Sequence, residues 1–143
     1  MDRETPFRNV RNAANIIATA AVFGDHATAV NGEASSDYIY VPDVAEALRL
    51  LLLAPSGALA YNIYNIAYGS ATTVYELLEM AKEVAPHLSL SIVRDGRADI
   101  KQRADQNTGR WGAFDIARVS ADVGWRPKPL REAIHDYIAF LRH

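Results

Sequence analysis

Residues 37–48 read Asp-Tyr-Ile-Tyr-Val-Pro-Asp-Val-Ala-Glu-Ala-Leu, and this stretch decides the fold. Residues 38–41 are aromatic or β-branched, which favours a β-strand. Pro42 suits the first turn of a helix, where its missing N–H would be unpaired in any case, and Asp43 adds negative charge at the helix N-terminus. The stretch therefore predicts a short strand followed at once by a helix that runs to about residue 54.

The helix that follows Pro42 is apolar on nearly every side. Its apolar residues include Val44, Leu48, Leu50, Leu51, Leu52 and Leu53. A helix of this kind is stable in water only when other elements cover it, so we expect it to be buried on more than one side.

The rest of the chain alternates helical and β-type patterns. Apolar periodicity predicts further helices over 7–23, 74–85, 116–123 and 129–141, and strands over 27–30, 61–66 and 88–93. Thr73 and Glu76 have the spacing of a capping box. The strand–helix–strand order of 61–93 has a βαβ rhythm, so the sequence predicts an α/β protein with short strands and about five helices.

Length and composition place the chain among ordinary globular domains. Its 143 residues fit a single domain over 1–143, and half of them are hydrophobic. A net charge of −2 predicts neither a nucleic-acid partner nor an anionic membrane partner. There is no cysteine, the histidines lack metal-ligand spacing, and the apolar run over 44–54 is too short to cross a bilayer. With no secretory signal at the N-terminus, we expect a cytoplasmic protein without a metal site.

Further motifs follow the opening stretch in a fixed order. They are the β-type run at 61–66, the turn at Gly69-Ser70, the helix start at 72–78, Asp115-Ile116-Ala117-Arg118, and Gly124-Trp125-Arg126-Pro127. In this order and at these spacings they resemble the C-terminal, substrate-binding part of the extended short-chain dehydrogenase/reductases, the NAD-dependent nucleotide-sugar epimerases and dehydratases. The resemblance implies a partial Rossmann-like, NAD(P)-binding fold, of which this chain is the C-terminal portion.

Two signatures of that family have no match in the sequence. The glycine-rich turn that lays a dinucleotide pyrophosphate on a helix N-terminus is missing, because Gly69 stands alone. The Tyr-x-x-x-Lys catalytic pair is missing as well, because no tyrosine is followed four places later by a lysine. NAD is thus implied by the family, but we expect no cofactor-binding and no catalytic residue in this chain, and no activity from the chain alone.

Substrate contacts implied by the resemblance fall in two places. Many relatives carry an arginine directly before the Asp-Tyr-Ile segment, where this chain has Ser36, and a hydroxyl does not replace a bidentate guanidinium. The second place is the basic segment 94–113, which predicts a phosphate contact by Arg110, supported by Arg97 and Asp99, with Trp111 able to stack on a base. The alternative for this segment is a solvated loop, because acidic residues are interleaved with the basic ones.

Three functional hypotheses stay open at this point. The chain is the nucleotide-sugar-binding portion of an epimerase-like or dehydratase-like enzyme, a stand-alone module that binds a nucleotide-sugar or other phosphorylated ligand, or an oligomeric structural remnant. Residues 61–66 and the apolar helix faces lack an obvious covering layer, so we also expect a homo-oligomer. We expect Asp37 to cap a turn and Asp43 to stabilise a helix start; the alternative is a substrate-facing or organising role for both. For Trp125 we expect packing in the core.

Overall fold

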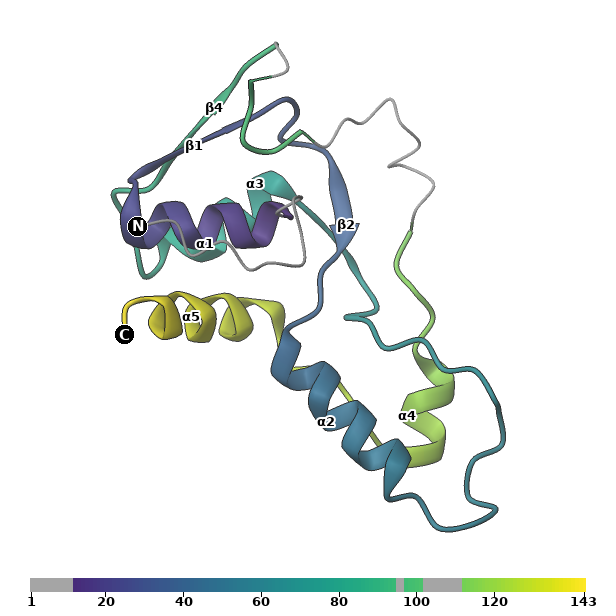
Figure 1. Cartoon of the computed structure of the whole chain (residues 1–143). Helices are drawn as coiled ribbons and strands as arrows, with labels where there is room; N and C mark the ends of the chain where they lie inside the picture. Colours follow the sequence, from purple (N-terminus) through teal and green to yellow (C-terminus); the bar gives the residue numbers. More distant parts are fainter. Residues whose placement is uncertain (1–11, 95–96, 102–111) are drawn as a thin grey trace.

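The computed structural model describes residues 12–94, 97–101 and 112–143. The elements along the chain are α1 (Ala13–Phe23), β1 (His26–Ala29), β2 (Ser35–Asp37), α2 (Val41–Leu52), β3 (Ala71–Thr73), α3 (Val74–Lys82), β4 (Ser89–Ile92), α4 (Ala117–Val123) and α5 (Leu130–Leu141). They form the predicted α/β fold, with five helices and short strands among the described residues (Figure 1).

The strands form two small sheets. β1 pairs in parallel with β4, with His26 opposite Ser89 and Ala29 opposite Ile92, and Ile100 adds a parallel bridge to Ala29. β2 pairs antiparallel with β3, with Ser35 opposite Thr73. The strands on either side of α3 thus belong to different sheets, so the βαβ unit predicted over 61–93 is wrong. The parallel partner of β4 is instead β1, which precedes α2 in the chain.

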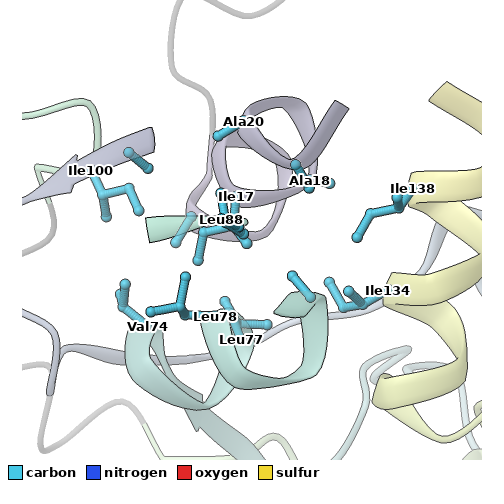
Figure 2. Packing of buried hydrophobic residues seen from close by; sticks show 14 of the residues in the cluster. Ile17, Ala18, Ala20, Val74, Leu77, Leu78, Leu88, Ile100, Ile134 and Ile138 are labelled. Atoms are coloured by element: carbon cyan, nitrogen blue, oxygen red, sulfur yellow. The ribbon is translucent and has the colours of Figure 1, made fainter. Parts of the chain in front are cut away.

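The main core lies between three helices and the β1–β4 sheet. Helices α1, α3 and α5 pack against one another, and α1 also contacts β1. Ile17, Leu77 and Ile138 contribute fully buried side chains from the three helices, and Figure 2 shows them pointing into a common interior. The predicted periodicities are confirmed for α1, α3 and α5, and residues 7–11 of the helix predicted over 7–23 lie outside the described residues. The capping box is confirmed as well, because Thr73 and Glu76 exchange hydrogen bonds.

A second, smaller cluster joins α2 to α4. Its buried residues are Ala47, Val119 and Trp125, and residues of the 61–66 segment pack against it. Trp125 is 3% exposed, which confirms the predicted packing role. Figure 1 shows α2 and α4 side by side, away from the α1–α3–α5 core.

Three expectations for this second region are wrong. The predicted strand over 38–41 is displaced to β2, because Ser35–Asp37 finds a pairing partner in β3, whereas Tyr38 turns its side chain into the core. Residues 61–66 form no strand, because no described segment lies in position to share a ladder with them. Finally, α2 has a single buried residue, Ala47, so among the described residues it is covered on one side only.

Candidate functional site

The end of β2 is the point where several separate segments converge. The Asp37 carboxylate accepts hydrogen bonds from the backbone N–H groups of Tyr68 at 2.8 Å, Gly69 at 3.0 Å and Phe114 at 3.0 Å. The expected turn cap is therefore present, and the bond to Phe114 extends it across the fold. One carboxylate ties β2 to the turn before β3 and to the C-terminal end of the basic segment.

Gly69 has a backbone conformation and a position that favour glycine. Its φ angle is +83°, in the left-handed region that other residues rarely adopt. A Cβ atom at this position would lie 3.1 Å from Cδ1 of Ile116, which packs in the α2–α4 cluster. The turn therefore presents its N–H to Asp37 while leaving room for the residue that precedes α4.

The N-terminal end of the basic segment is fixed by a second carboxylate. Oδ2 of Asp99 accepts from the backbone N–H of Thr28 at 2.9 Å and from its hydroxyl at 2.7 Å, and the hydroxyl accepts from the Asp99 N–H at 3.0 Å. Ala98 and Ile100, on either side, are buried. Residues 98–100 are thereby attached to β1, next to the β1–β4 sheet.

Both anchors hold a segment whose middle lies outside the described residues. Arg110 and Trp111, predicted to contact phosphate and base, are among the residues that the structure does not describe. Arg97 is exposed at the N-terminal end, and Ser36 lies in β2 opposite Thr72. The structure thus places Ser36 next to the anchor of one end of the basic segment, and Arg97 and Asp99 at the other end.

Sequence reasoning missed two contributors to this arrangement. Thr28 was not singled out, because its partner Asp99 is 71 residues away and no local pattern reveals such a contact. For Asp37 the sequence favours a turn cap over an organising role, although its place directly after Ser36 is a signal that it belongs to the same site. Tyr38, directly after β2, is buried, and its burial raises the pKa of its hydroxyl. A hydrogen bond with Ser36 lowers this pKa and offsets part of the rise.

Side chains of α4 fix the 61–66 segment in place. Asp122 accepts from the Tyr64 hydroxyl at 2.6 Å and from the Ala60 N–H at 2.8 Å. The Arg118 guanidinium lies 4.5 Å from the ring centroid of Tyr61, a cation–π contact. The hydrogen bond from Tyr64 holds the pKa of the Asp122 carboxyl below its usual range. The segment is therefore held by side chains rather than by a β-ladder.

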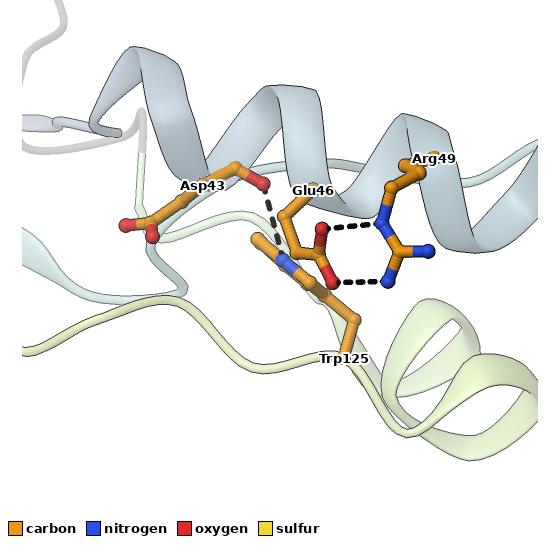
Figure 3. A network of polar contacts seen from close by, with 4 residues as sticks. All are labelled: Asp43, Glu46, Arg49 and Trp125. Carbon is orange, nitrogen blue, oxygen red and sulfur yellow. Dashed lines mark hydrogen bonds and ion pairs between the residues drawn. The ribbon is translucent and has the colours of Figure 1, made fainter.

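Helix α2 is joined to the segment after α4 by backbone and side-chain contacts (Figure 3). The Trp125 indole N–H donates to the Asp43 carbonyl at 3.1 Å, and the Asp43 carboxylate accepts from the Lys128 N–H at 3.2 Å. The Asp43 carboxylate thus bonds outside its own helix, in addition to placing negative charge in the first turn.

Neither the turn at Gly69 nor the N-terminus of α3 fits the pyrophosphate of a dinucleotide. A cofactor of this kind needs free backbone N–H groups at a glycine-rich turn and helix N-terminus. Here the Gly69 N–H is bonded to Asp37, and the N-terminus of α3 is closed by the carboxylate of Glu76, which would repel a phosphate. The described residues also contain no group of acidic, histidine or cysteine side chains suited to a metal ion. None of the helices in the described part of the chain is both apolar enough and long enough to cross a bilayer.

Comparison with known proteins reveals two related enzymes. The UDP-glucose 4-epimerase of Corynebacterium glutamicum is 28% identical over 121 residues, which are 83% of this chain and 34% of the epimerase. The UDP-glucose 4-epimerase of Neisseria meningitidis serogroup B is 29% identical over 114 residues, which are 80% of this chain and 31% of that enzyme. No family model matches the chain.

A solved structure agrees with these relatives. The GalE-like L-threonine dehydrogenase from Cupriavidus necator, in its apo form, superposes with a TM-score of 0.70 and 27% identity, over 90% of this chain and 45% of that enzyme. The chain is homologous to part of the extended short-chain dehydrogenase/reductases. The predicted resemblance and the Rossmann-like fold class are therefore confirmed, and the chain spans about a third of the length of the curated relatives it matches.

Proposed function

We propose that the chain is the substrate-binding part of an NAD-dependent epimerase-like or dehydratase-like protein that acts on nucleotide-sugars, and that it has no activity alone. The observation that carries this proposal is the match to two UDP-glucose 4-epimerases over at least 80% of the chain but only about a third of their length. The absence of the glycine-rich turn and of the Tyr-x-x-x-Lys pair from the sequence supports it, as does the Gly69 N–H, which is bonded to Asp37.

In this proposal the two anchored ends of the basic segment hold its cations over the substrate. Loops fixed on a rigid scaffold are a common way to build a binding site. Arg110 and Arg97 would contact the diphosphate, and Trp111 would stack on the base. Asp99 was predicted to support a phosphate contact; because its Oδ2 atom bonds to Thr28, we propose that it acts by fixing the segment.

Ligand binding tests the proposal directly. UDP-glucose at about a hundred times its dissociation constant should add about 2.7 kcal/mol to the free energy of unfolding, a shift that thermal denaturation resolves. NAD should give no shift, and an epimerase assay on the chain alone should show no turnover. Arg110→Ala should remove the UDP-glucose shift. Lys82→Ala is the matched control, because Lys82 pairs with Glu79 on the surface of α3.

A substitution at Ser36 tests the proposal by a gain of affinity. If Ser36 occupies the place of the diphosphate-binding arginine, Ser36→Arg should tighten UDP-glucose binding by about tenfold, the effect of one charge-assisted contact worth about 1.4 kcal/mol. An unchanged affinity, together with retained folding, would place the diphosphate elsewhere.

A second candidate substrate is an amino acid. The GalE-like enzyme from Cupriavidus necator is an L-threonine dehydrogenase, and an amino-acid substrate has no diphosphate for a guanidinium to bind. Ser36 in place of arginine favours this candidate. A thermal shift with L-threonine and none with UDP-glucose would decide for it.

We further propose that the isolated chain is a homo-oligomer. Most of the exposed large apolar side chains of the described residues lie in one stretch: Val41, Leu48, Leu52, Leu53, Leu59, Tyr61 and Ile63. Exposed apolar side chains gathered in one part of the chain favour an interaction site there. The molar mass from light scattering tests the proposal, and a monodisperse monomer contradicts it. An oligomer with no response to any ligand would instead support a structural remnant, and ligand binding without catalysis in any assembly would support a binding module.

A further inference from the structure

The connection between β1 and β2 contains Asn31-Gly32, the one Asn-Gly pair in the sequence. Such a pair favours a tight turn, and the structure has a turn at residues 32–33. The side-chain Oδ1 atom of Asn31 accepts a hydrogen bond from the backbone N–H of Glu33 at 2.9 Å. This contact is an Asx turn, in which the side chain follows the course of the main chain. Asn31 is half-buried and Glu33 is exposed, so water has access to this side of the turn.

Packing explains why a glycine follows Asn31. A Cβ atom at Gly32 would lie 2.1 Å from Cζ of Tyr75, closer than real side chains approach one another. The Tyr75 ring therefore occupies the space that any other residue would need at this position. The missing side chain also leaves the main-chain nitrogen of Gly32 unhindered. Among the described residues, no group accepts a hydrogen bond from this N–H, although Gly32 is buried.

The Asx turn brings a nucleophile and an electrophile together. The hydrogen bond from Glu33 closes a ring of atoms that contains the Gly32 nitrogen, so the Asn31 amide is held close to that nitrogen. The same N–H donor points at the oxygen on which negative charge develops when the amide carbon is attacked. Since no described residue accepts from the Gly32 N–H, its proton is removed without breaking a hydrogen bond. The turn thus meets the requirements for attack of the Gly32 nitrogen on Cγ of Asn31.

We infer that Asn31 is a site of spontaneous modification, at which the side-chain amide is lost through a cyclic imide. The Gly32 nitrogen gives its proton to hydroxide and forms a bond to Cγ of Asn31, and the Cγ–Nδ2 bond breaks. Nδ2 leaves as ammonia after taking a proton from water, which restores the hydroxide. Water then opens the imide at either of its two carbonyl carbons. Opening at Cγ gives aspartate, opening at the main-chain carbon gives isoaspartate, and neither step changes an oxidation state.

The two products have different consequences for the start of α3. The turn supplies acceptors for the first N–H groups of that helix, because Tyr75 donates to the Gly32 carbonyl and Val74 to the Ala34 carbonyl, each at 3.1 Å. These N–H groups have no partner within the helix. An aspartate at position 31 still accepts from the Glu33 N–H and leaves the turn intact. An isoaspartate lengthens the main chain by one carbon directly before Gly32, where the Tyr75 ring leaves no room, and so separates the turn from α3.

Incubation of the folded chain at mildly alkaline pH, followed by peptide mapping with mass spectrometry, tests the site. The peptide that contains Asn31 should gain the mass of an amide-to-acid change, and electron-transfer fragmentation should separate aspartate from isoaspartate. The rate should rise with the hydroxide concentration. It should be at least as high as in the urea-unfolded chain, where no turn holds the amide in place.

Two other asparagines of the same chain are internal controls. Asn15 and Asn65 are each followed by isoleucine, and each donates from its side-chain amide, Asn15 to the Tyr137 hydroxyl at 2.6 Å and Asn65 to the Asp115 carbonyl at 3.0 Å. Both should remain intact over the time in which Asn31 reacts.

Denaturation of the aged chain tests the consequence. The isoaspartyl fraction should melt at a lower temperature than the fresh chain, and the amides of Val74 and Tyr75 should lose protection against hydrogen exchange. Asn31→Ser is the matched control, because a serine hydroxyl still accepts from the Glu33 N–H but cannot form the imide. Asn31→Asp reproduces the aspartate product and should leave the denaturation temperature unchanged.

Three results would overturn the inference. An Asn31 amide that survives in the folded chain but reacts in the unfolded chain would show that the fold protects it. Loss of the Asn15 or Asn65 amide at the same rate would show general ageing rather than a reaction of this turn. An isoaspartyl chain as stable as the fresh one would remove the proposed effect on α3. None of these results depends on ligand binding, so the inference is tested separately from the proposed function.

Discussion

The region around α1, α3 and α5 and the region around α2 and α4 contain similar apolar sequences but bury them differently. In the first region Ile17, Leu77 and Ile138 are all 0% exposed. In the second, Leu52 is 83% exposed and Ile63 is 72% exposed, although both belong to apolar runs. A helix forms from local hydrogen bonds, but its apolar face is stabilised only where another element covers it. The first region covers its helices with its own residues, whereas in the second region the described residues cover α2 on one side only.

The largest expected effect separates the two regions by stability. Leu77→Ala should lower the free energy of unfolding by about 2–5 kcal/mol, because it removes buried contacts and leaves a cavity. Leu52→Ala, at an exposed position of α2, should change it by less than about 0.5 kcal/mol at a concentration where the chain is monomeric. Urea denaturation measures both. Equal losses would mean that α2 is covered by a layer absent from the described residues.

A smaller effect concerns the contact that joins the regions. Asp37→Ala leaves the N–H groups of Tyr68, Gly69 and Phe114 without their acceptor, which should lower the free energy of unfolding by about 1–3 kcal/mol. Hydrogen exchange should show these three amides losing protection, while amides of α3 keep theirs. Faster exchange throughout the chain would instead indicate that the loss of this contact destabilises both regions together.

The α3 cap should contribute less. Thr73→Ala removes the hydroxyl that accepts from the Glu76 N–H at 3.1 Å, which should lower the free energy of unfolding by about 1 kcal/mol. Thr73→Ser retains the hydroxyl and is the matched control. If both variants lower the free energy of unfolding equally, the loss comes from the β2–β3 pairing rather than from the cap.

The smallest effect is a pH dependence in the second region. The hydrogen bond from Tyr64, and next the one from Ala60, keep the pKa of Asp122 below its usual range. A carboxyl whose pKa is lower in the folded state contributes stability above its unfolded pKa of about 4, and that contribution is lost as the pH falls through the folded pKa. Tyr64→Phe should therefore lower the denaturation temperature slightly near pH 7 and flatten the acid limb of the profile, so that the variant and the original chain converge at the lowest pH. An unchanged acid limb would show that this bond does not form in solution.

Local patterns accounted for much of the fold. The helix around residues 13–23, the capping box of α3, the strand near residue 90 and the left-handed Gly124 that ends α4 were readable because each depends on residues a few positions apart. The strand predicted at 61–66 fails for the opposite reason, since a strand needs a neighbour that the local sequence does not reveal. The shift from 38–41 to 35–37 has the same origin, because pairing with β3 selects the register.

For the candidate site, the sequence by itself determined the residue types: the basic segment, Ser36 before Asp37, and the missing cofactor motifs. Those are facts of composition and order. Only the tertiary structure decided that Asp37 fixes one end of the basic segment and that Asp99 and Thr28 fix the other, because hydrogen bonds between residues 71 and 77 positions apart depend on how the sheets assemble. It likewise decided that one apolar face of α2 packs on Trp125 while the other stays exposed. The sequence sets which faces are apolar, and the neighbours that the fold supplies set which of them are buried.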